Sequence, residues 1–469
     1  MSQIVDIDRL VDDQKIRWFN VSLLVWSFLA MFADGYDFGV LAVAQPELQT
    51  LWHVPKEAFG IASSASLVGI LFGAPLLGAL GDRSGRKRAI VLGSVIYGLC
   101  SLAIMFTHSI WQIALVRLMV GIGLGGIMPN AIALNSELSP VRLRATLVTL
   151  MFSGITLGSS APGFVSNWLV PRHGWTVLFL VGAVVPLGVA ACLTVALPES
   201  VKLLATQPGR QRELVRIARR MRPDLSIAED AQFVSQLPGT RHDARLSQLF
   251  AGSLAWITPL LWVCFLTSLM SNFFLNSFLP LILRDSGMPA VQANNANALY
   301  HVGGTVGGIV MSALLDRFGF AVIAVLFVLA VPAIASLGVV GVSFGTFAPL
   351  ATLAGLAVLG ALFGNNAAAG LLYPTAVRSK GVGWALGIGR FGAIVGPLVG
   401  GLLLARHLPL RQLFMAAAAP MLLGAVAALL LVRLCYLRLG GLRLHDRPQR
   451  PEPAAALLPV AKGYAGPAD

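Results

Sequence analysis

Long apolar stretches recur along the whole chain, separated by short polar segments. Each stretch is long enough, at about 20 residues or more, for an α-helix to cross the hydrocarbon core of a bilayer. The first is too long for a signal-peptide core and no small-residue cleavage site follows it, so we expect it to remain in the protein. Twelve spans are predicted, at residues 19–46, 58–81, 89–107, 110–134, 144–170, 175–197, 255–283, 293–315, 320–341, 346–371, 381–405 and 410–437. The pattern indicates an all-α membrane protein.

The two halves of the chain repeat each other at one fixed displacement. The segment Ala79–Gly85 aligns with Ala313–Gly319. Three further pairs fall at the same displacement: Pro140 and Pro374, Arg144 and Arg378, and Gly158 and Gly392. Six spans repeated in the same sense describe two parallel bundles related by an axis along the membrane normal, with a substrate site near the midplane between them.

The repeat divides the chain into five parts. We expect a cytoplasmic N-terminal tail at 1–18, a six-helix bundle at 19–197, a cytoplasmic linker at 198–252, a second six-helix bundle at 253–437 and a cytoplasmic C-terminal tail at 438–469. The linker is rich in arginine and proline, and its segment Glu213–Met221 is predicted to form a short amphipathic helix.

Composition and charge agree with a membrane location. The chain is 56% hydrophobic and 12% charged, whereas soluble proteins average about 25% charged residues. The net charge is +13, which in a soluble protein would suggest nucleic-acid binding. Here 27 of the 34 Lys and Arg residues fall on one side of the predicted spans, five on the other and two inside spans. This asymmetry follows the positive-inside rule. It places both termini in the cytoplasm, with contact to anionic lipid as a secondary role.

Two aspartates lie inside the first span, in the run Ala33-Asp34-Gly35-Tyr36-Asp37. An ionisable residue at bilayer depth costs roughly 2.5–3.5 kcal/mol on insertion scales, so it is retained mainly where it functions. Asp34 and Asp37 are three residues apart and share a helix face. We interpret them as proton-coupling residues; the alternative is a structural ion pair with another helix.

Two arginines inside spans, Arg117 and Arg390, are candidates for holding an anion. A guanidinium binds a carboxylate through two parallel hydrogen bonds. The alternative is permanent pairing with Asp34 or Asp37, and for Arg117 the two interpretations are evenly balanced.

Other in-span polar residues are weaker candidates for substrate contact. They are Tyr36, which with nearby phenylalanines would stack on an aromatic ring, Asn272 and Asn276 on one face of the seventh span, and His301 in the eighth. Glycine pairs four residues apart predict close helix contacts: Gly121 and Gly125, Gly383 and Gly387, and Gly392, Gly396 and Gly400.

The turn between the second and third spans carries a dense polar motif. We interpret it as a gating loop in which Gly85 permits the turn, formed by Gly78, Asp82, Arg83, Gly85 and Arg86 with Lys87 and Arg88.

These motifs resemble the major facilitator superfamily, and more narrowly its aromatic acid:proton symporter family. The segment Gly78–Arg88 is similar to the superfamily's signature loop. Asp34–Asp37, Arg117–Pro140 and Tyr373–Gly392 resemble the symporter family's first, fourth and tenth-to-eleventh spans. In the second half Ser312 stands at the position of Gly78, so that loop departs from the motif.

The resemblance implies a proton-coupled secondary transporter of the inner (cytoplasmic) membrane that imports small aromatic carboxylates of the hydroxybenzoate and benzoate class by alternating access. Another organic acid, muconate-like or phenylpropionate-like, and export remain open, as does a non-transporting membrane sensor. The sequence sets neither the proton stoichiometry nor the oligomeric state, and a functional monomer is expected.

Several other classes of protein are disfavoured by missing motifs. The sequence contains no phosphate-binding loop, no nucleophile motif and no repeated polar filter, which disfavours ATP-driven transport, an enzyme and a channel. Its four cysteines lack metal-ligand spacing. We therefore expect no cofactor, no metal, no disulfide and no nucleic-acid partner.

Overall fold

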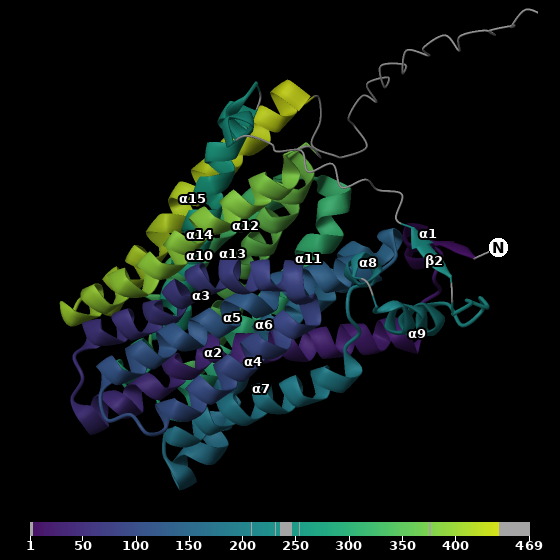
Figure 1. Ribbon diagram of the computed structural model, residues 1–469. Coiled ribbons are helices and arrows are strands. Elements are labelled where there is room, and N and C mark those ends of the chain that lie inside the picture. The colour runs from purple at the N-terminus through teal and green to yellow at the C-terminus, as the bar shows by residue number, and fades with distance from the viewer. Residues whose placement is uncertain are drawn as a thin grey trace, which may run out of the picture.

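The computed structural model describes residues 3–207, 209–229, 231–234, 246–252, 254–374 and 377–439. Its elements are β1 (Ile4–Asp6), α1 (Ile7–Asp12), α2 (Trp18–Trp52), α3 (Lys56–Ser84), α4 (Arg86–Ile104), α5 (Ile110–Leu138), α6 (Val141–His173), α7 (Thr176–Ala196), α8 (Val201–Thr206), α9 (Gln211–Met221), β2 (Gln232–Val234), the 3-10 helix η1 (Leu246–Phe250), α10 (Leu254–Asp285), α11 (Ala290–Phe318), α12 (Ala321–Leu337), α13 (Phe344–Leu372), α14 (Arg378–Ala405) and α15 (Leu410–Leu439). The long helices form one elongated bundle (Figure 1).

The twelve predicted spans correspond to twelve apolar helices, α2–α7 and α10–α15. Among the described residues, eleven helices are long and apolar enough to cross a membrane. The twelfth, α12, is equally apolar but only 17 residues long. It ends before Gly338, where the chain turns, so the predicted span 320–341 is too long by a turn at this end. Most of the predicted C-terminal tail lies outside the described residues.

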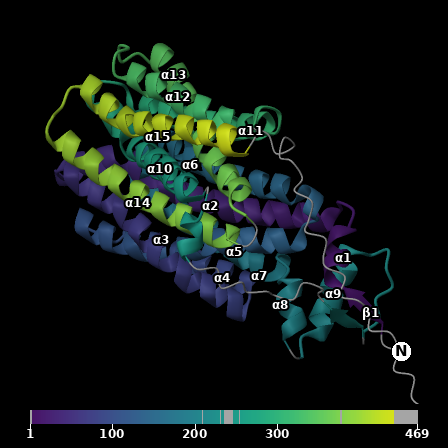
Figure 2. The ribbon, with the colours of Figure 1, turned by 90° about the horizontal axis from the view of Figure 1, so that it is seen from above.

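The internal duplication is visible in the helix packing. In the first half α2 packs on α6, α3 on α5 and α4 on α7. The corresponding helices of the second half pair in the same way, α10 on α14, α11 on α13 and α12 on α15. The halves meet along α3 with α14 and along α6 with α11, again as a symmetric pair of contacts (Figure 2). The prediction of two six-helix repeats is therefore confirmed.

The glycine pairs contribute differently to this packing. A Cβ at Gly121 or Gly125 would collide with α3, and one at Gly392 or Gly396 with α10. These glycines therefore allow close helix contact, as predicted. No atom lies within 4 Å of the position that a Cβ would take at Gly383 or Gly387. Among the described residues this pair makes no close helix contact, so the prediction is wrong for it in this conformation.

The linker and the N-terminal segment fold together beside the first bundle. Strand β1 pairs in parallel with β2. The expected amphipathic helix is α9, which buries Leu214, Val215 and Ile217 and exposes its arginines. Leu10 of α1 packs against this buried face. A strand of three residues carries too little pattern to be recognised in a sequence, so the pairing was not expected.

Candidate functional site

A cavity lies between the two halves, with a free volume of about 160 Å³. Helices α2, α3, α5 and α6 provide one wall, which is largely apolar. Helices α10, α11, α13 and α14 provide the other. The second wall carries the polar lining residues Asn272, Asn276, His301, Asn366 and Arg390. An apolar pocket with a few convergent polar groups is the usual form of a small-molecule site.

Arg390 of α14 is the cation of this cavity wall. Among the described residues its guanidinium forms no hydrogen bond and no ion pair closer than 4.0 Å. Asp34, a buried carboxylate on α2 of the other half, forms no ion pair with it within 4.0 Å. An arginine at this depth without a direct partner is costly, and a bound anion would reduce that cost.

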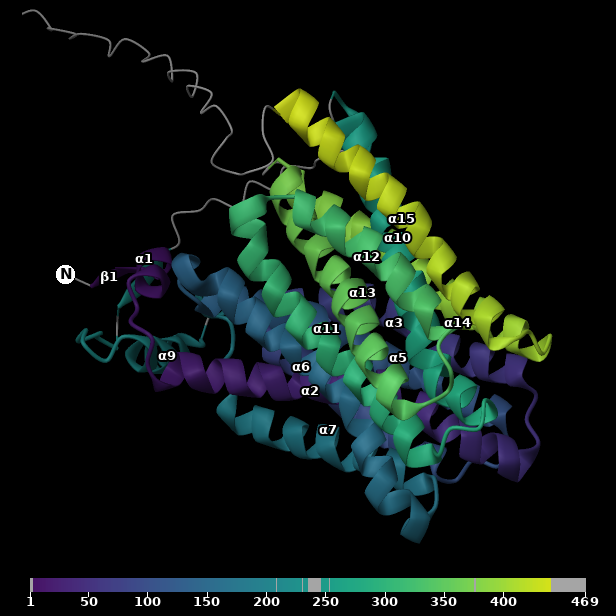
Figure 3. The same ribbon diagram turned by 180° about the vertical axis from the view of Figure 1, so that it is seen from behind.

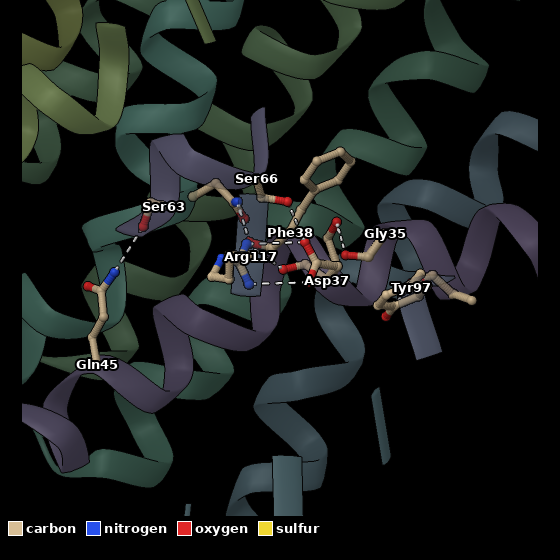
Figure 4. Close-up of polar contacts among 11 residues, drawn as sticks. Gly35, Asp37, Phe38, Gln45, Ser63, Ser66, Tyr97 and Arg117 are labelled. Carbon is tan, nitrogen blue, oxygen red and sulfur yellow. Dashed lines mark hydrogen bonds and ion pairs between the residues drawn. The ribbon is translucent and has the colours of Figure 1, made fainter. Parts of the chain in front are cut away.

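Arg117 of α5 is in the opposite situation. It is 3% exposed, and its Nη1 and Nη2 donate to the carboxylate of Asp37 at 3.2 and 3.1 Å. The hydroxyl of Ser66 on α3 donates to the same carboxylate at 3.1 Å (Figure 4). Arg117 borders a second, smaller cavity next to the central one. Of the two interpretations open for Arg117, pairing with an acid is the one present in this conformation.

Asp34 and Asp37 therefore have different surroundings although both are buried. Asp37 is neutralised by an arginine and accepts a hydroxyl hydrogen bond. The Oδ1 atom of Asp34 has no hydrogen-bond partner among the described residues. A buried carboxylate that lacks a donor is poorly stabilised in its charged form, so the two acids are not equivalent in the structure.

Gly35 allows helix α6 to reach this region. A Cβ at Gly35 would lie 2.0 Å from the carbonyl oxygen of Ile155, so only glycine permits this approach of α2 to α6. The Ser159 hydroxyl donates to the Gly35 carbonyl at 3.0 Å. Ile155 and Ser159 both line the cavity. Gly35 thus lets α6 approach α2 closely enough for Ile155 and Ser159 to form part of the cavity wall.

Tyr36 is directed away from the cavity. Its ring is buried, its hydroxyl donates to the carbonyl oxygen of Leu178 on α7 at 3.0 Å, and it is not among the lining residues. The aromatic rings that do line the cavity include Phe38, Phe152 and Phe273, and Phe38 packs edge-on against Phe273 at 5.3 Å. Of these, Phe38 is one of the phenylalanines near Tyr36 considered from the sequence, whereas Phe152 and Phe273 were not singled out, because aromatic residues occur in every predicted span.

The remaining candidates, Asn276 and His301, both line the cavity, as does Asn272. The amide of Asn276 donates to the carbonyl oxygen of Phe38 at 2.8 Å and so connects α10 to α2. Asn366 of α13 was missed. The pair Asn365-Asn366 in an otherwise apolar span was the signal that could have identified it.

The gating-loop residues lie at the ends of α3 and α4, away from the cavity. Asp82 pairs with Arg86, which also lies 3.5 Å from Glu137 at the end of α5. Asp82 and Arg83 are exposed. Gly85 has a φ of +122°, and a Cβ there would lie 2.1 Å from the Glu199 carboxylate.

Gly85→Ala should therefore lower the thermal stability of the purified protein and its folded yield. The substitution combines a backbone strain of about 1–3 kcal/mol, for a side chain in this sparsely populated backbone region, with a collision against Glu199. Gly78→Ala is the matched control, because nothing lies within 4 Å of its Cβ position in the same motif. The stabilities are compared by the loss of monodisperse protein on heating in detergent. Equal stability of the two variants would contradict this role of Gly85.

The two halves are joined by ion pairs at one end of the bundle. Arg284 of α10 contacts Glu47 of α2 at 2.9 Å, and Lys56 of α3 pairs with Asp285. Asn167 of α6 donates to Asn295 of α11 at 2.8 Å at the same end. Toward the opposite end, which carries α1 and α9, the helices of the two halves diverge (Figure 3). The cavity is thus closed off by direct contacts at one end.

Sequence comparisons agree with this architecture. The model of the Major Facilitator Superfamily matches residues 27–331 and again 261–462. The chain is 35% identical to the gallate transporter of Pseudomonas putida, over 91% of this chain and 94% of that protein. It is 34% identical to the 4-hydroxybenzoate transporter PcaK of Pseudomonas aeruginosa, over 91% of this chain and 95% of that protein. It is 31% identical to the benzoate transport protein of Acinetobacter baylyi, covering 92% and 93%.

A solved structure supports the same fold. The xylose transporter XylE from E. coli, in a partially occluded inward-open conformation, superposes with a TM-score of 0.68 at 17% sequence identity, covering 89% of this chain and 98% of that one. The fold and the matches define a multi-pass membrane transporter rather than an enzyme. The chain belongs to the Major Facilitator Superfamily and, within it, to the family of the aromatic acid transporters.

Proposed function

We propose that this protein imports small aromatic carboxylates of the hydroxybenzoate and benzoate class together with protons. The observation that carries the proposal is Arg390, a cation without a direct partner on the wall of an otherwise largely apolar cavity. A single-ring acid has the complementary structure, an apolar ring and one carboxylate. The relatives named for gallate, 4-hydroxybenzoate and benzoate support this substrate class.

In this proposal the charged residues have separate roles. Arg390 binds the substrate carboxylate through two parallel hydrogen bonds. Asp34 takes up the proton, and the attraction between the opposite charges of Asp34 and Arg390 couples the two events. Asp37 and Arg117 form a buried ion pair that holds α2 against α5. Asn276 and His301, which line the cavity, contact the aromatic ring of the substrate.

Transport proceeds by alternating access, with the two bundles 19–197 and 253–437 rocking about the cavity. With both termini and the linker 198–252 in the cytoplasm, the end closed by Glu47–Arg284 and Lys56–Asp285 faces outward. The conformation described here is then inward-facing. The gating loop at 78–86 lies at the cytoplasmic end, and the protein acts as a monomer in the cytoplasmic membrane.

Uptake into proteoliposomes tests this function. Purified protein should accumulate labelled 4-hydroxybenzoate when the outside is made acidic, and a protonophore should abolish the accumulation. A failure to move any aromatic acid would refute the proposal and favour a sensor, whereas uptake of only a muconate-like acid would favour the other organic-acid carrier. Uptake that ignores the pH gradient would remove proton coupling alone, and net movement only outward would identify an exporter.

The topology is tested by labelling of engineered cysteines. A cysteine at Arg216, an exposed position of α9, should not react with an impermeant maleimide in intact cells and should react after permeabilisation. A cysteine at Arg172, exposed at the end of α6, should react in intact cells and serves as the positive control. Ready labelling of position 216 from outside would overturn the cytoplasmic placement of the linker.

A further inference from the structure

The polar side chains that line the cavity differ in whether they already have hydrogen-bond partners. On the wall formed by the first half, the hydroxyl of Ser159 already donates to the carbonyl oxygen of Gly35. The hydroxyl of Thr156 lies 2.6 Å from that of Thr305. On the opposite wall, His301 and Asn276 each keep a polar atom without a hydrogen-bond partner among the described residues. Among the described lining residues, the buried polar atoms without any hydrogen-bond partner thus lie on the wall that also carries Arg390.

His301 is the most sharply defined of these groups. It is 3% exposed and lines the cavity. Its Nε2 atom is buried and has no hydrogen-bond partner in the part of the chain that the structure describes. A buried polar atom without a partner is uncommon in folded proteins and costs free energy, so it calls for an explanation.

The ring of His301 is held in place by its neighbours. The ring of Tyr300 lies edge-to-face against it, with the centroids 5.2 Å apart. The Tyr300 hydroxyl donates to the side-chain oxygen of Asn272 on α10 at 3.0 Å. This bond fixes α11 against the neighbouring cavity helix. The ring contact with Tyr300 thus restricts the movement of the imidazole, which favours a preorganised site.

We propose that His301 accepts a hydrogen bond at Nε2 from a ring hydroxyl of the substrate, so that the cavity selects hydroxylated aromatic acids over unsubstituted ones. The inference rests on the proposed function, because Arg390 must bind the carboxylate of the same molecule. A neutral imidazole has one acceptor nitrogen, and a phenolic hydroxyl is a matching donor. Benzoate would enter the same cavity but would leave Nε2 unpaired.

A second acceptor extends the argument to more hydroxyl groups. The side-chain oxygen of Asn276 is also buried and without a hydrogen-bond partner among the described residues, while its amide nitrogen is occupied by the carbonyl oxygen of Phe38. A ring with more than one hydroxyl could therefore satisfy both His301 and Asn276. An unsubstituted ring could satisfy neither.

The test is the ratio of two affinities, measured by equilibrium binding of 4-hydroxybenzoate and benzoate to the purified protein. The wild-type protein should bind 4-hydroxybenzoate about ten-fold or more tightly than benzoate. Benzoate lacks the hydroxyl donor and leaves a buried acceptor unpaired. His301→Leu should reduce this ratio to near one. His301→Gln, which retains an acceptor oxygen, should keep part of it. A purely structural role would lower both affinities and leave the ratio unchanged, and that result would overturn the inference.

A comparison among ligands keeps the test decisive even if His301→Leu fails to fold. The analogue 4-methoxybenzoate has the same ring oxygen but no hydrogen to donate. The wild-type protein should therefore bind it as weakly as benzoate or more weakly. Equal affinity for 4-hydroxybenzoate and 4-methoxybenzoate would refute hydroxyl recognition while leaving the proposed function intact. Absence of binding by all three acids would refute the proposed function itself.

Discussion

Replacing Arg390 with lysine should weaken binding of an aromatic carboxylate by about thirty-fold or more, although the positive charge is retained. Loss of a hydrogen-bonded charged contact in a buried site costs about 2–5 kcal/mol, and a lysine ammonium cannot reproduce the two parallel hydrogen bonds of a guanidinium. The structure favours this role because Arg390 lines the cavity and has no direct partner among the described residues. A structural arginine of the kind represented by Arg117 would be paired.

The measurement compares the substrate acid with its uncharged amide. The unsubstituted protein should bind the acid far more tightly than the amide, and Arg390→Lys should lose most of this difference. Arg406→Lys is the control, because Arg406 is exposed just beyond the end of the same helix and should leave the preference unchanged. Full acid-over-amide preference in Arg390→Lys would show that Arg390 is structural and would make Arg117 the leading candidate.

The sequence predicted the framework of the site because its signals are local. Twelve apolar stretches and one constant displacement between the halves are enough to define two bundles and the surface between them. The cost of a charge in the membrane identifies Asp34, Asp37, Arg117 and Arg390 without any knowledge of packing. These inferences need only composition and order along the chain.

The pairing of these charges could not be predicted, because it depends on helix rotation and helix separation. Two acids and two arginines allow several ion pairs. In the structure Arg117 is bound to Asp37, while Arg390 forms no ion pair with Asp34 within 4.0 Å. The direction of Tyr36, by contrast, could have been predicted from helix periodicity. Successive residues of an α-helix are about 100° apart, so a residue between two acids that share a face points away from them, toward α7.

Asp37→Asn and Asp34→Asn should therefore fail in different ways. Asp37→Asn leaves the guanidinium of Arg117 buried without its counter-charge, and breaking a buried ion pair costs about 3–5 kcal/mol. Its expression and its thermal stability in detergent should fall sharply. Asp34 has an oxygen without a hydrogen-bond partner among the described residues, so Asp34→Asn should keep the fold. It should nevertheless abolish accumulation of substrate driven by a pH gradient.

Two further measurements separate coupling from stability. Removing both charges in Asp37→Asn/Arg117→Gln should restore part of the lost stability, because no unpaired charge then remains in the interior. Asp34→Asn should still exchange labelled for unlabelled substrate across the membrane, since exchange needs no net proton movement. Accumulation equal to that of the unsubstituted protein in both Asp34→Asn and Asp37→Asn would rule out a proton role for either acid. If the expression and thermal stability of Asp34→Asn fall as far as those of Asp37→Asn, both carboxylates are instead assigned to structural ion pairing.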